Sequence, residues 1–164
     1  MCIRDRLTDL AIKIGQLLSV DNQSIVTAES CTGGWIGKEF TAIPGSSRWY
    51  GYGFITYSNF AKINILGVSK DLIKKEGAVC EEVVREMALG AINSSGADYS
   101  IAVSGIAGPT GGTIEKPVGT VCFAIGSKDN LCTFTKNFEG DRDAVRYKSL
   151  EFAFDSLIKR LQLK

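Results

Sequence analysis

The sequence predicts an α/β protein, a three-layer α/β/α sandwich built on a mixed, mostly parallel sheet. Segments rich in β-branched and aromatic residues alternate with segments of helical apolar spacing, which is typical of parallel strands joined by helices. Late in the chain, two β-rich segments, 118–125 and 131–138, follow each other around a short polar stretch. This pair indicates a hairpin, so part of the sheet is expected to be antiparallel.

In the N-terminal half, leucine and isoleucine residues at helical spacing predict a helix over 7–19. The segments that follow are a β-rich strand over 24–28, an apolar helix over 35–43, an aromatic strand over 49–57, and short helices over 58–66 and 69–75. Ser58 or Asn59 is the expected N-cap of the first short helix, and Gly77 closes the second.

The C-terminal half begins with a helix over 81–94, whose apolar residues fall on one face. A strand over 99–104 leads into a long loop rich in glycine and proline over 105–117. The two hairpin strands come next. A last helix starts near Gly140 and continues to the C-terminus.

The composition fits one globular domain with no general affinity for polyanions. The chain of 164 residues is 45% hydrophobic and 23% charged, close to the average for a soluble domain. Lys and Arg number 19 and Asp and Glu 18, a net charge of +1, so nucleic acid and anionic membranes are not expected partners. The absence of a signal peptide and of a long apolar run favours a cytoplasmic location.

Residues 7–164 are expected to form this single domain, because no linker or internal repeat interrupts them. The preceding residues 1–6, MCIRDR, show no apolar periodicity and resemble a translated adapter sequence. They are therefore left out of the predicted fold.

Histidine is absent, and this absence narrows the possible chemistry. The chain has no Ser-His-Asp or Cys-His catalytic group and lacks the commonest metal ligand. The five cysteines form no C-x-x-C pair, so we expect them to be reduced thiols. We expect neither a metal site nor a cofactor. A hydrolase with this sequence would need Lys, Tyr or a carboxylate as its base.

Three glycine-bearing loops lie where predicted strands end, which is where open α/β sheets bind ligands. The first, AESCTGG over 28–34, leads into a helix. The N-terminus of that helix offers unpaired N–H groups and a positive dipole end to a phosphate or an oxyanion. The alternative is a simple cap of the helix by Ser30 or Thr32.

The second loop, 104–112, matches neither the Walker A motif nor the dinucleotide fingerprint, and is either a ligand loop or a mobile connection. In the third, 140–146, Arg142 and Arg146 share one helix face. They form either an anion clamp or ion pairs with the neighbouring aspartates. Lys62 is a candidate base if burial lowers its pKa, and an ordinary surface lysine otherwise.

Five segments together resemble the CinA C-terminal domain family, from about Leu7 to Leu161. They are TAESCTGGWIGKEFTAIPGSS, YGFITYSNFAK, GAVCEEVVREMALGA, SGIAGPTGGTIEKPVGTV and GDRDAVR. In bacteria this is the nicotinamide-nucleotide amidase (NMN deamidase, PncC) family. The resemblance implies hydrolysis of nicotinamide mononucleotide to nicotinate mononucleotide and ammonia in pyridine-nucleotide salvage. It also implies a homo-oligomer and a serine nucleophile with a lysine base.

The resemblance assigns Ser30 as nucleophile, Lys62 as base, and Tyr57 as a hydroxyl that orients Lys62 or relays a proton. Backbone N–H groups of one of two segments would hold the oxyanion. The first segment contains Cys31, Thr32, Gly33 and Gly34, and the second contains Ser104, Gly105 and Gly108. Arg142 is the expected phosphate contact, and Ser46 and Ser47 are lesser candidates.

Two residues near these positions leave alternatives open. Cys31 is a rival nucleophile, less favoured because no histidine can activate it. Family members often carry Glu where this chain has Phe60, so the surroundings of Lys62 differ here. The alternative functions are a non-catalytic nucleotide-binding or regulatory module of a longer competence/damage-inducible protein, and a Ser–Lys hydrolase of another small amide.

Overall fold

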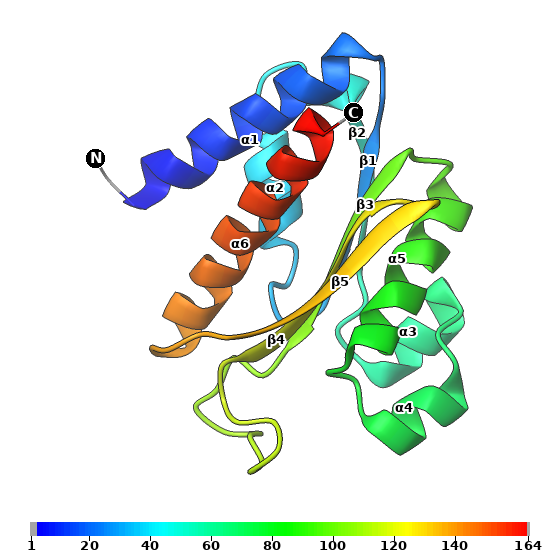
Figure 1. The fold of residues 1–164 in the computed structure, drawn as a ribbon, viewed down its shortest axis with the longest axis vertical. Helices are drawn as coiled ribbons and strands as arrows, with labels where there is room; N and C mark the ends of the chain where they lie inside the picture. Colours follow the sequence, from blue (N-terminus) through cyan, green and yellow to red (C-terminus); the bar gives the residue numbers. More distant parts are fainter. Residues whose placement is uncertain (1–2, 164) are drawn as a thin grey trace.

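A five-stranded sheet separates two layers of helices, which confirms the predicted three-layer sandwich (Figure 1). The computed structural model describes residues 3–163. The strands lie in the order β2 (Tyr50–Ile55), β1 (Ile25–Glu29), β3 (Tyr99–Gly105), β4 (Thr120–Ser127) and β5 (Asn130–Asn137). β1 is parallel to β2 and β3, whereas β4 is antiparallel to β3 and β5. In the described sheet, β4 therefore runs against the other strands.

Each face of the sheet is covered by its own helices and has its own apolar core. One layer contains α1 (Ile3–Val20), α2 (Trp35–Thr41) and α6 (Arg142–Gln162). The other contains α3 (Asn59–Leu66), α4 (Lys70–Glu76) and α5 (Glu81–Ser95), as Figure 1 shows. Every residue of β1 is buried because both of its faces are covered, as expected for a central parallel strand.

Most observed elements start and end within a few residues of the predicted ranges. The main difference is α1, which already begins at Ile3 rather than Leu7. Arg6 joins α1 to α6 through ion pairs with Glu151 and Asp155. Charged residues that pair across helices leave no trace in apolar periodicity, which explains the late predicted start. Met1 and Cys2 of the MCIRDR segment lie outside the described residues.

The observed end of β2 differs from the predicted end, and this changes the backbone next to Ser30. The strand was predicted to run to Tyr57 but ends at Ile55. Thr56 and Tyr57 leave the sheet and lead directly into α3, which begins after Ser58. Their carbonyl oxygens are therefore free of sheet pairing and can accept hydrogen bonds from a side chain.

The parallel strands β1, β2 and β3 bring their carboxyl ends to one edge of the sheet. Ser30 follows β1, Tyr57 follows β2 closely, and Ser104 and Gly105 end β3. Sequence-distant residues meet at this edge because parallel strands point the same way. Within residues 3–163, no helix combines the length and the apolarity that a membrane span requires.

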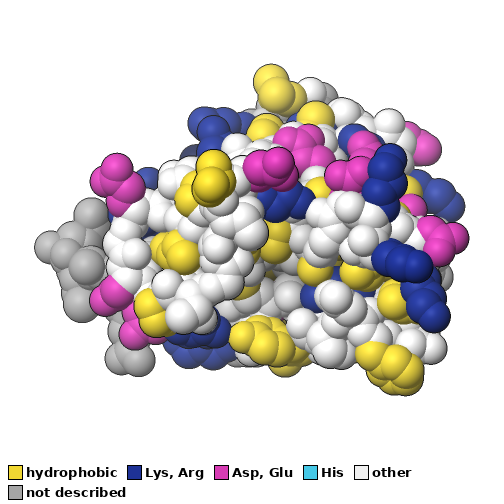
Figure 2. Space-filling view, turned by 90° about the horizontal axis from the view of Figure 1, so that it is seen from below, with side chains coloured by type: hydrophobic (Ala, Val, Ile, Leu, Met, Phe, Trp, Pro, Cys, Tyr) yellow, Lys and Arg dark blue, Asp and Glu magenta, His cyan; other side chains and the backbone are white. Residues whose placement is uncertain are grey.

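Figure 2 shows the lower end of the molecule, where the loop between β3 and β4 hangs in Figure 1. Lys and Arg side chains are interspersed there with Asp and Glu side chains. A bound anion at this end would therefore depend on a few placed cations rather than on a broad basic face.

Candidate active site

Lys62 and Ser30 are in direct contact. The Lys62 Nζ atom donates a hydrogen bond to Ser30 Oγ at 2.9 Å. It also donates to the carbonyl oxygens of Thr56 at 2.9 Å and Tyr57 at 3.3 Å. The structure thus joins the two residues that the resemblance assigned as nucleophile and base, although 32 positions separate them.

Burial of Lys62 opposes the charged form of its amine. Its side chain is only 1% exposed. All three hydrogen-bond acceptors are neutral oxygens, one hydroxyl and two carbonyls. Burial lowers the pKa of Lys62 from its ordinary value. A buried lysine with a lowered pKa can accept a proton from a neighbouring hydroxyl, which a surface lysine at neutral pH cannot.

The local sequence explains how Lys62 reaches Ser30. Ser58 caps α3, since its side chain accepts a hydrogen bond from the N–H of Ala61. Lys62 lies one turn into the helix, and helical side chains lean toward the N-terminus. The amine is therefore directed back toward Thr56, Tyr57 and the end of β1.

The Ser30–Lys62 pair opens into a cavity of about 200 Å³. Its lining residues are Ser30, Cys31, Tyr57, Asn59, Lys62, Ala78, Val79, Ser104, Gly105, Ala107 and Arg142. They come from the ends of β1, β2 and β3 and from the N-terminal ends of α3, α5 and α6. We call this cavity the Ser30 pocket.

The Tyr57 hydroxyl was expected near Lys62 but is bonded to Arg142. Its hydroxyl accepts a hydrogen bond from Arg142 Nη2 at 3.0 Å. Its backbone carbonyl, rather than the hydroxyl, is bonded to Lys62. Arg142 Nη1 also donates to the carbonyl of Gly108 at 2.7 Å, so one guanidinium joins two walls of the Ser30 pocket. Arg142 thus lines the Ser30 pocket, and Gly108 lies next to Arg142 through this hydrogen bond.

The segment after Ser30 is held by a buried carboxylate. Glu29, which is 1% exposed, accepts hydrogen bonds from Thr32 Oγ1 at 2.7 Å and from the N–H groups of Ile36 at 2.9 Å and Gly37 at 3.1 Å. Burial raises the pKa of this carboxyl, and these donors oppose the rise.

This arrangement corrects two expectations about the first loop. The N-terminus of α2 does not present its N–H groups to a phosphate, because the Glu29 carboxylate occupies them. Neither Ser30 nor Thr32 caps the helix, whose N-cap is Gly34 without a side-chain bond. The Thr32 hydroxyl instead donates to Glu29. A side chain from the preceding strand supplies the negative charge that the helix terminus favours.

The expected oxyanion donors of this loop are only partly accessible. The N–H of Gly33 donates to the carbonyl of Ser30 at 3.0 Å. The N–H of Gly34 interacts with the Glu29 carboxylate. Cys31 and Thr32 therefore remain as backbone donors of that loop. From the other segment, Gly105 lines the Ser30 pocket, and the Ser104 hydroxyl donates to the carbonyl of Ala78 at 2.8 Å.

Cys31 is poorly suited to act as the rival nucleophile. The residue is 6% exposed. Burial raises the pKa of its thiol to about 12. The thiolate is the reactive form, and a thiol with such a pKa is almost entirely protonated at neutral pH.

Arg142 and Arg146 do not form a joint anion clamp. Arg146 lies beside the turn that follows Ser30, where its Nε donates to the carbonyl of Cys31 at 3.1 Å and its Nη2 to that of Thr32 at 3.2 Å. Its Nη1 is 3.6 Å from an oxygen of Asp143. Of the two arginines, Arg142 alone lines the Ser30 pocket.

Ser46 and Ser47 are not brought to this site within the chain. They lie in a 3₁₀ turn, Ser46–Arg48, that precedes β2. Tyr50 at the start of β2 pairs with Ile25 at the start of β1, whereas Ser30 follows the end of β1. The length of β1, about 16 Å for five residues, separates the two edges. A phosphate contact by these serines has no support from this geometry.

Phe60 lies at the protein surface, outside the Ser30 pocket. Its side chain is 74% exposed, and it is not among the residues that line the Ser30 pocket. The position at which the resemblance led us to expect Glu thus lies at the surface of α3, while Asn59 forms part of the pocket wall. The sequence analysis missed four lining residues, because neutral side chains carry no catalytic signal of their own: Asn59, Ala78, Val79 and Ala107.

Comparison with known proteins identifies the family. The profile of the CinA C-terminal domain matches residues 7–161, so the chain belongs to the CinA C-terminal domain family. Nicotinamide-nucleotide amidohydrolase PncC of Enterobacter agglomerans is 48% identical over 155 residues, covering 94% of each chain. A CinA-like protein of Fervidobacterium nodosum is 51% identical over 87% of this chain, which corresponds to 35% of that longer protein.

The fold of this chain also matches that of solved structures of competence damage-inducible proteins. The competence damage-inducible protein A of Klebsiella pneumoniae superposes with a TM-score of 0.92 at 35% identity. The match covers 95% of this chain and 97% of that one. The arrangement of strands and helices around the Ser30 pocket is therefore an arrangement that this family shares.

Proposed function

We propose that this protein hydrolyses the carboxamide of nicotinamide mononucleotide to nicotinate mononucleotide and ammonia, with Ser30 as nucleophile and Lys62 as base. The observation that carries the proposal is the contact between the buried Lys62 amine and the Ser30 hydroxyl. The names of the PncC relatives, at 48% identity over nearly the whole chain, support the substrate.

The first half of the reaction forms an acyl-enzyme. When Lys62 is uncharged, its two N–H groups can still donate to the carbonyls of Thr56 and Tyr57, and the bond with Ser30 reverses, so that the Ser30 O–H donates to the Nζ lone pair. The proton passes to Nζ as Oγ attacks the amide carbon. The carbonyl oxygen becomes an oxyanion, which backbone N–H groups of Cys31, Thr32 or Gly105 would hold. Each such donor contributes about 3–4 kcal/mol to transition-state stabilisation. The Lys62 ammonium then gives its proton to the nitrogen that leaves as ammonia.

The second half returns the enzyme to its starting state. A water molecule attacks the acyl carbon while the neutral Lys62 amine takes one of its protons. The tetrahedral intermediate collapses, Ser30 leaves as the alkoxide, and the Lys62 ammonium returns the proton to it. The products are the free acid and the unchanged pair. The cycle needs no histidine, in agreement with the composition.

Arg142 is the proposed contact for the substrate phosphate. It lines the Ser30 pocket from the first turn of α6, and both of its bonded partners, Tyr57 and Gly108, are neutral. The guanidinium charge is therefore available to an anion. Because the phosphate does not react, its binding energy would orient the amide against Ser30. A place in pyridine-nucleotide salvage, a cytoplasmic location and a homo-oligomeric state remain predictions.

Ammonia release from nicotinamide mononucleotide tests the proposal directly. Ser30→Ala and Lys62→Met are each expected to lower kcat by at least about a thousandfold, because each removes one member of the pair. Lys74→Met is the matched control, since Lys74 is exposed on the neighbouring helix α4. Full activity of a folded Ser30→Ala protein would disprove the serine mechanism.

Binding and ammonia-release measurements on the same protein distinguish two other functions. The similarity to one part of longer CinA-like proteins favours a non-catalytic nucleotide-binding module as second candidate. That function predicts calorimetric binding of the mononucleotide without ammonia release. Release of ammonia from other small amides, but not from the mononucleotide, would instead indicate a Ser–Lys amidase of different specificity.

A further inference from the structure

The surface along β2 and the start of α3 is apolar and carries no charge. Between Arg48 and Lys70 the only charged residue is Lys62, and that side chain is buried. Five of the nine large hydrophobic side chains that are exposed in the described part of the chain lie here: Tyr52, Ile55, Tyr57, Phe60 and Ile65. We call the surface formed by β2 and these five residues the β2 edge. An exposed apolar patch of this kind is typical of a surface that binds another protein.

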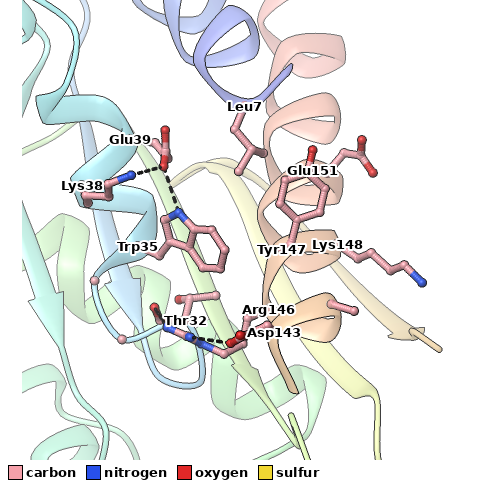
Figure 3. Close-up of a pocket in the computed structure, with 13 residues that line it drawn as sticks. Leu7, Thr32, Trp35, Lys38, Glu39, Asp143, Arg146, Tyr147, Lys148 and Glu151 are labelled. Carbon is pink, nitrogen blue, oxygen red and sulfur yellow. Dashed lines mark hydrogen bonds and ion pairs between the residues drawn. The ribbon is translucent and has the colours of Figure 1, made fainter. Parts of the chain in front are cut away.

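Another hollowed part of the surface is charged instead. Figure 3 shows a cavity of about 890 Å³ between α2 and α6. The cations and carboxylates that line it balance each other, with Lys38, Arg146 and Lys148 against Glu39, Asp143 and Glu151. Mixed charges are typical of a surface that stays in contact with water. The β2 edge has no such charges, so burial against a partner is favourable for it.

The backbone of β2 is also unpaired along one side. β2 is the first strand of the sheet, and β1 is the only described strand that pairs with it. The backbone groups that face away from β1 can therefore accept another strand. Proteins commonly protect such an edge with charged residues or proline, and β2 contains neither. A bulge interrupts the register between Tyr50 and Tyr52, so the regular part of the strand begins at Tyr52.

The Ser30 pocket is small for the substrate of the proposed reaction. Its volume of about 200 Å³ falls below the roughly 300–1,000 Å³ of typical small-molecule sites. A mononucleotide with its amide at Ser30 would therefore extend beyond the pocket. Tyr57 lines the pocket and also belongs to the β2 edge. A partner bound at the β2 edge would thus add a wall to the site.

A second copy of the chain fits this edge. Strand β2 can pair with β2 of another copy in antiparallel orientation, which satisfies both open edges and closes the assembly by a two-fold axis. An uncharged surface is compatible with its own copy, because no like charges meet across the axis. Antiparallel pairing brings the start of one β2 next to the end of the other. Each copy would then border the Ser30 pocket of the other copy.

The same pairing would bring Arg48 of the partner subunit to this pocket. Arg48 precedes β2 by two residues and Tyr57 follows it by two, so both are equally far from the middle of the strand. Within one chain, Arg48 and Ser30 lie at opposite ends of the parallel strands. In the pair, β2 of the partner lies about 10 Å from β1, two strand spacings away. Arg48 is exposed and its Nε donates to the neutral carbonyl of Gly45 at 3.4 Å, so its charge is available to an anion.

We propose that two copies of this chain pair through the β2 edge about a two-fold axis, and that Arg48 of the partner subunit completes each Ser30 pocket. There its guanidinium provides a second positive charge for the substrate phosphate, in addition to Arg142. The role of Arg48 rests on the proposed amidase function, whereas the pairing of the two copies does not.

Sedimentation velocity tests the pairing without reference to catalysis. At a chain concentration of about 50 μM, we expect the parent protein to sediment as a dimer. Tyr52→Lys should convert most of it to a monomer, because pairing about the axis brings two added charges together near the middle of β2. Ile12→Lys, at an exposed residue of α1, is the matched control and should remain dimeric. A monomeric parent protein, or a folded Tyr52→Lys protein that remains dimeric, would overturn the proposal.

A cross-link tests the two-fold arrangement without destabilising the pair. In Tyr52→Cys, the two introduced thiols lie close to the axis, so a short bis-maleimide should join the two chains. Ile12→Cys should give no such product. Mass spectrometry of the linked peptide distinguishes this product from links through the native Cys80 and Cys132. A Tyr52→Cys dimer whose thiol is modified by the reagent but not linked to its copy would show that the chains pair elsewhere.

Mixing two variants tests whether Arg48 acts across the pair. Arg48→Ala alone should raise KM for the mononucleotide by about tenfold with little change in kcat, because a phosphate contact is lost. In a dimer of one Arg48→Ala chain and one Ser30→Ala chain, one pocket combines an intact Ser30 with Arg48 of the partner subunit. With equal amounts and random pairing, about one pocket in four is complete, so kcat/KM should reach about a quarter of the parent value.

Arg142→Ala mixed with Ser30→Ala is the matched control for this experiment. Arg142 lines the Ser30 pocket of its own chain, so the mixed dimer contains no complete pocket and activity should not be restored. If the Arg48→Ala mixture behaves like this control, Arg48 does not act across the pair. If the protein proves not to be an amidase, sedimentation and cross-linking still decide whether two copies pair through the β2 edge.

Discussion

Glu29 and Lys62, two buried ionisable side chains close to Ser30, lie in contrasting surroundings. Each is 1% exposed, and burial moves the pKa of each toward the neutral form. The carboxylate of Glu29 is surrounded by donors from Thr32 and α2, and Glu29 does not line the Ser30 pocket. The amine of Lys62 lines the Ser30 pocket and touches a reactive hydroxyl. Burial shifts both pKa values, but of these two groups only Lys62 reaches a cavity that a substrate could enter.

The pH dependence of catalysis provides the largest expected effect. The proposed mechanism requires Lys62 as the uncharged amine, so kcat/KM should rise about tenfold per pH unit up to the lowered pKa of Lys62, and then level off. The measurement is kcat/KM for the mononucleotide from pH 5 to 10. A rate independent of pH in this range would show that Lys62 is not the base.

The same two groups shift stability in opposite directions with pH. For Lys62, the unfolded chain binds a proton between the lowered folded pKa and 10.5, so the free energy of unfolding rises with pH in that window. For Glu29, the folded protein retains its proton between 4.5 and the raised folded pKa, so stability falls as pH rises there.

The next largest effect is expected on KM, from loss of the proposed phosphate contact. Arg142→Ala should raise KM for nicotinamide mononucleotide by about 10–100-fold, because a charge-assisted hydrogen bond to the phosphate is lost. KM for nicotinamide riboside, which lacks the phosphate, should change little. Arg160→Ala, on the same helix and bonded to Asn130, is the control. An equal rise in KM for both substrates would show that Arg142 acts on the pocket walls rather than on the phosphate.

A smaller effect is expected at Glu29. Glu29→Gln keeps the shape but places an amide N–H where an oxygen now accepts from a backbone N–H of α2, which costs about 1–3 kcal/mol of stability. Denaturant unfolding at pH 7 measures this loss, and kcat should fall less than about tenfold. If a folded Glu29→Gln protein were as inactive as Lys62→Met, the contrast between the two buried groups would fail.

The smallest effect is expected at Cys31. Cys31→Ala should keep activity within about threefold of the parent, because a thiol with a pKa of about 12 contributes no thiolate at neutral pH. Alkylation by iodoacetamide at pH 8 should modify the partly exposed Cys80 and Cys132 before Cys31. Rapid labelling of Cys31 with parallel loss of activity would restore it as a candidate nucleophile.

Much of the fold was predictable because its elements are locally encoded. The buried strands β1, β3 and β4 stand out as β-rich segments, and the hairpin is marked by its polar turn. The position of the site at the carboxyl edge of the sheet also follows from the order of the elements. The extent of α1 was not predictable in the same way, since its first turn is tied down by ion pairs to α6.

The residues of the site were only partly predictable. Ser30, Lys62 and Arg142 were assigned by resemblance to the family, and nothing in their spacing joins them. The roles of Glu29 and Arg146 were missed, because a carboxylate that fills a helix terminus and a guanidinium that holds two carbonyls act through backbone atoms. Such contacts leave no pattern in the order of side chains.

The sequence by itself determined the α/β class, the strand ends at which ligands could bind, and a chemistry without histidine. These properties follow from composition and short-range periodicity, which each segment carries independently of the others. Only the tertiary structure decided that the Lys62 amine is buried against Ser30 and that Glu29 occupies the N-terminus of α2. Desolvation and hydrogen bonding depend on atoms that meet in space, and the chain brings those atoms together only when the parallel strands align.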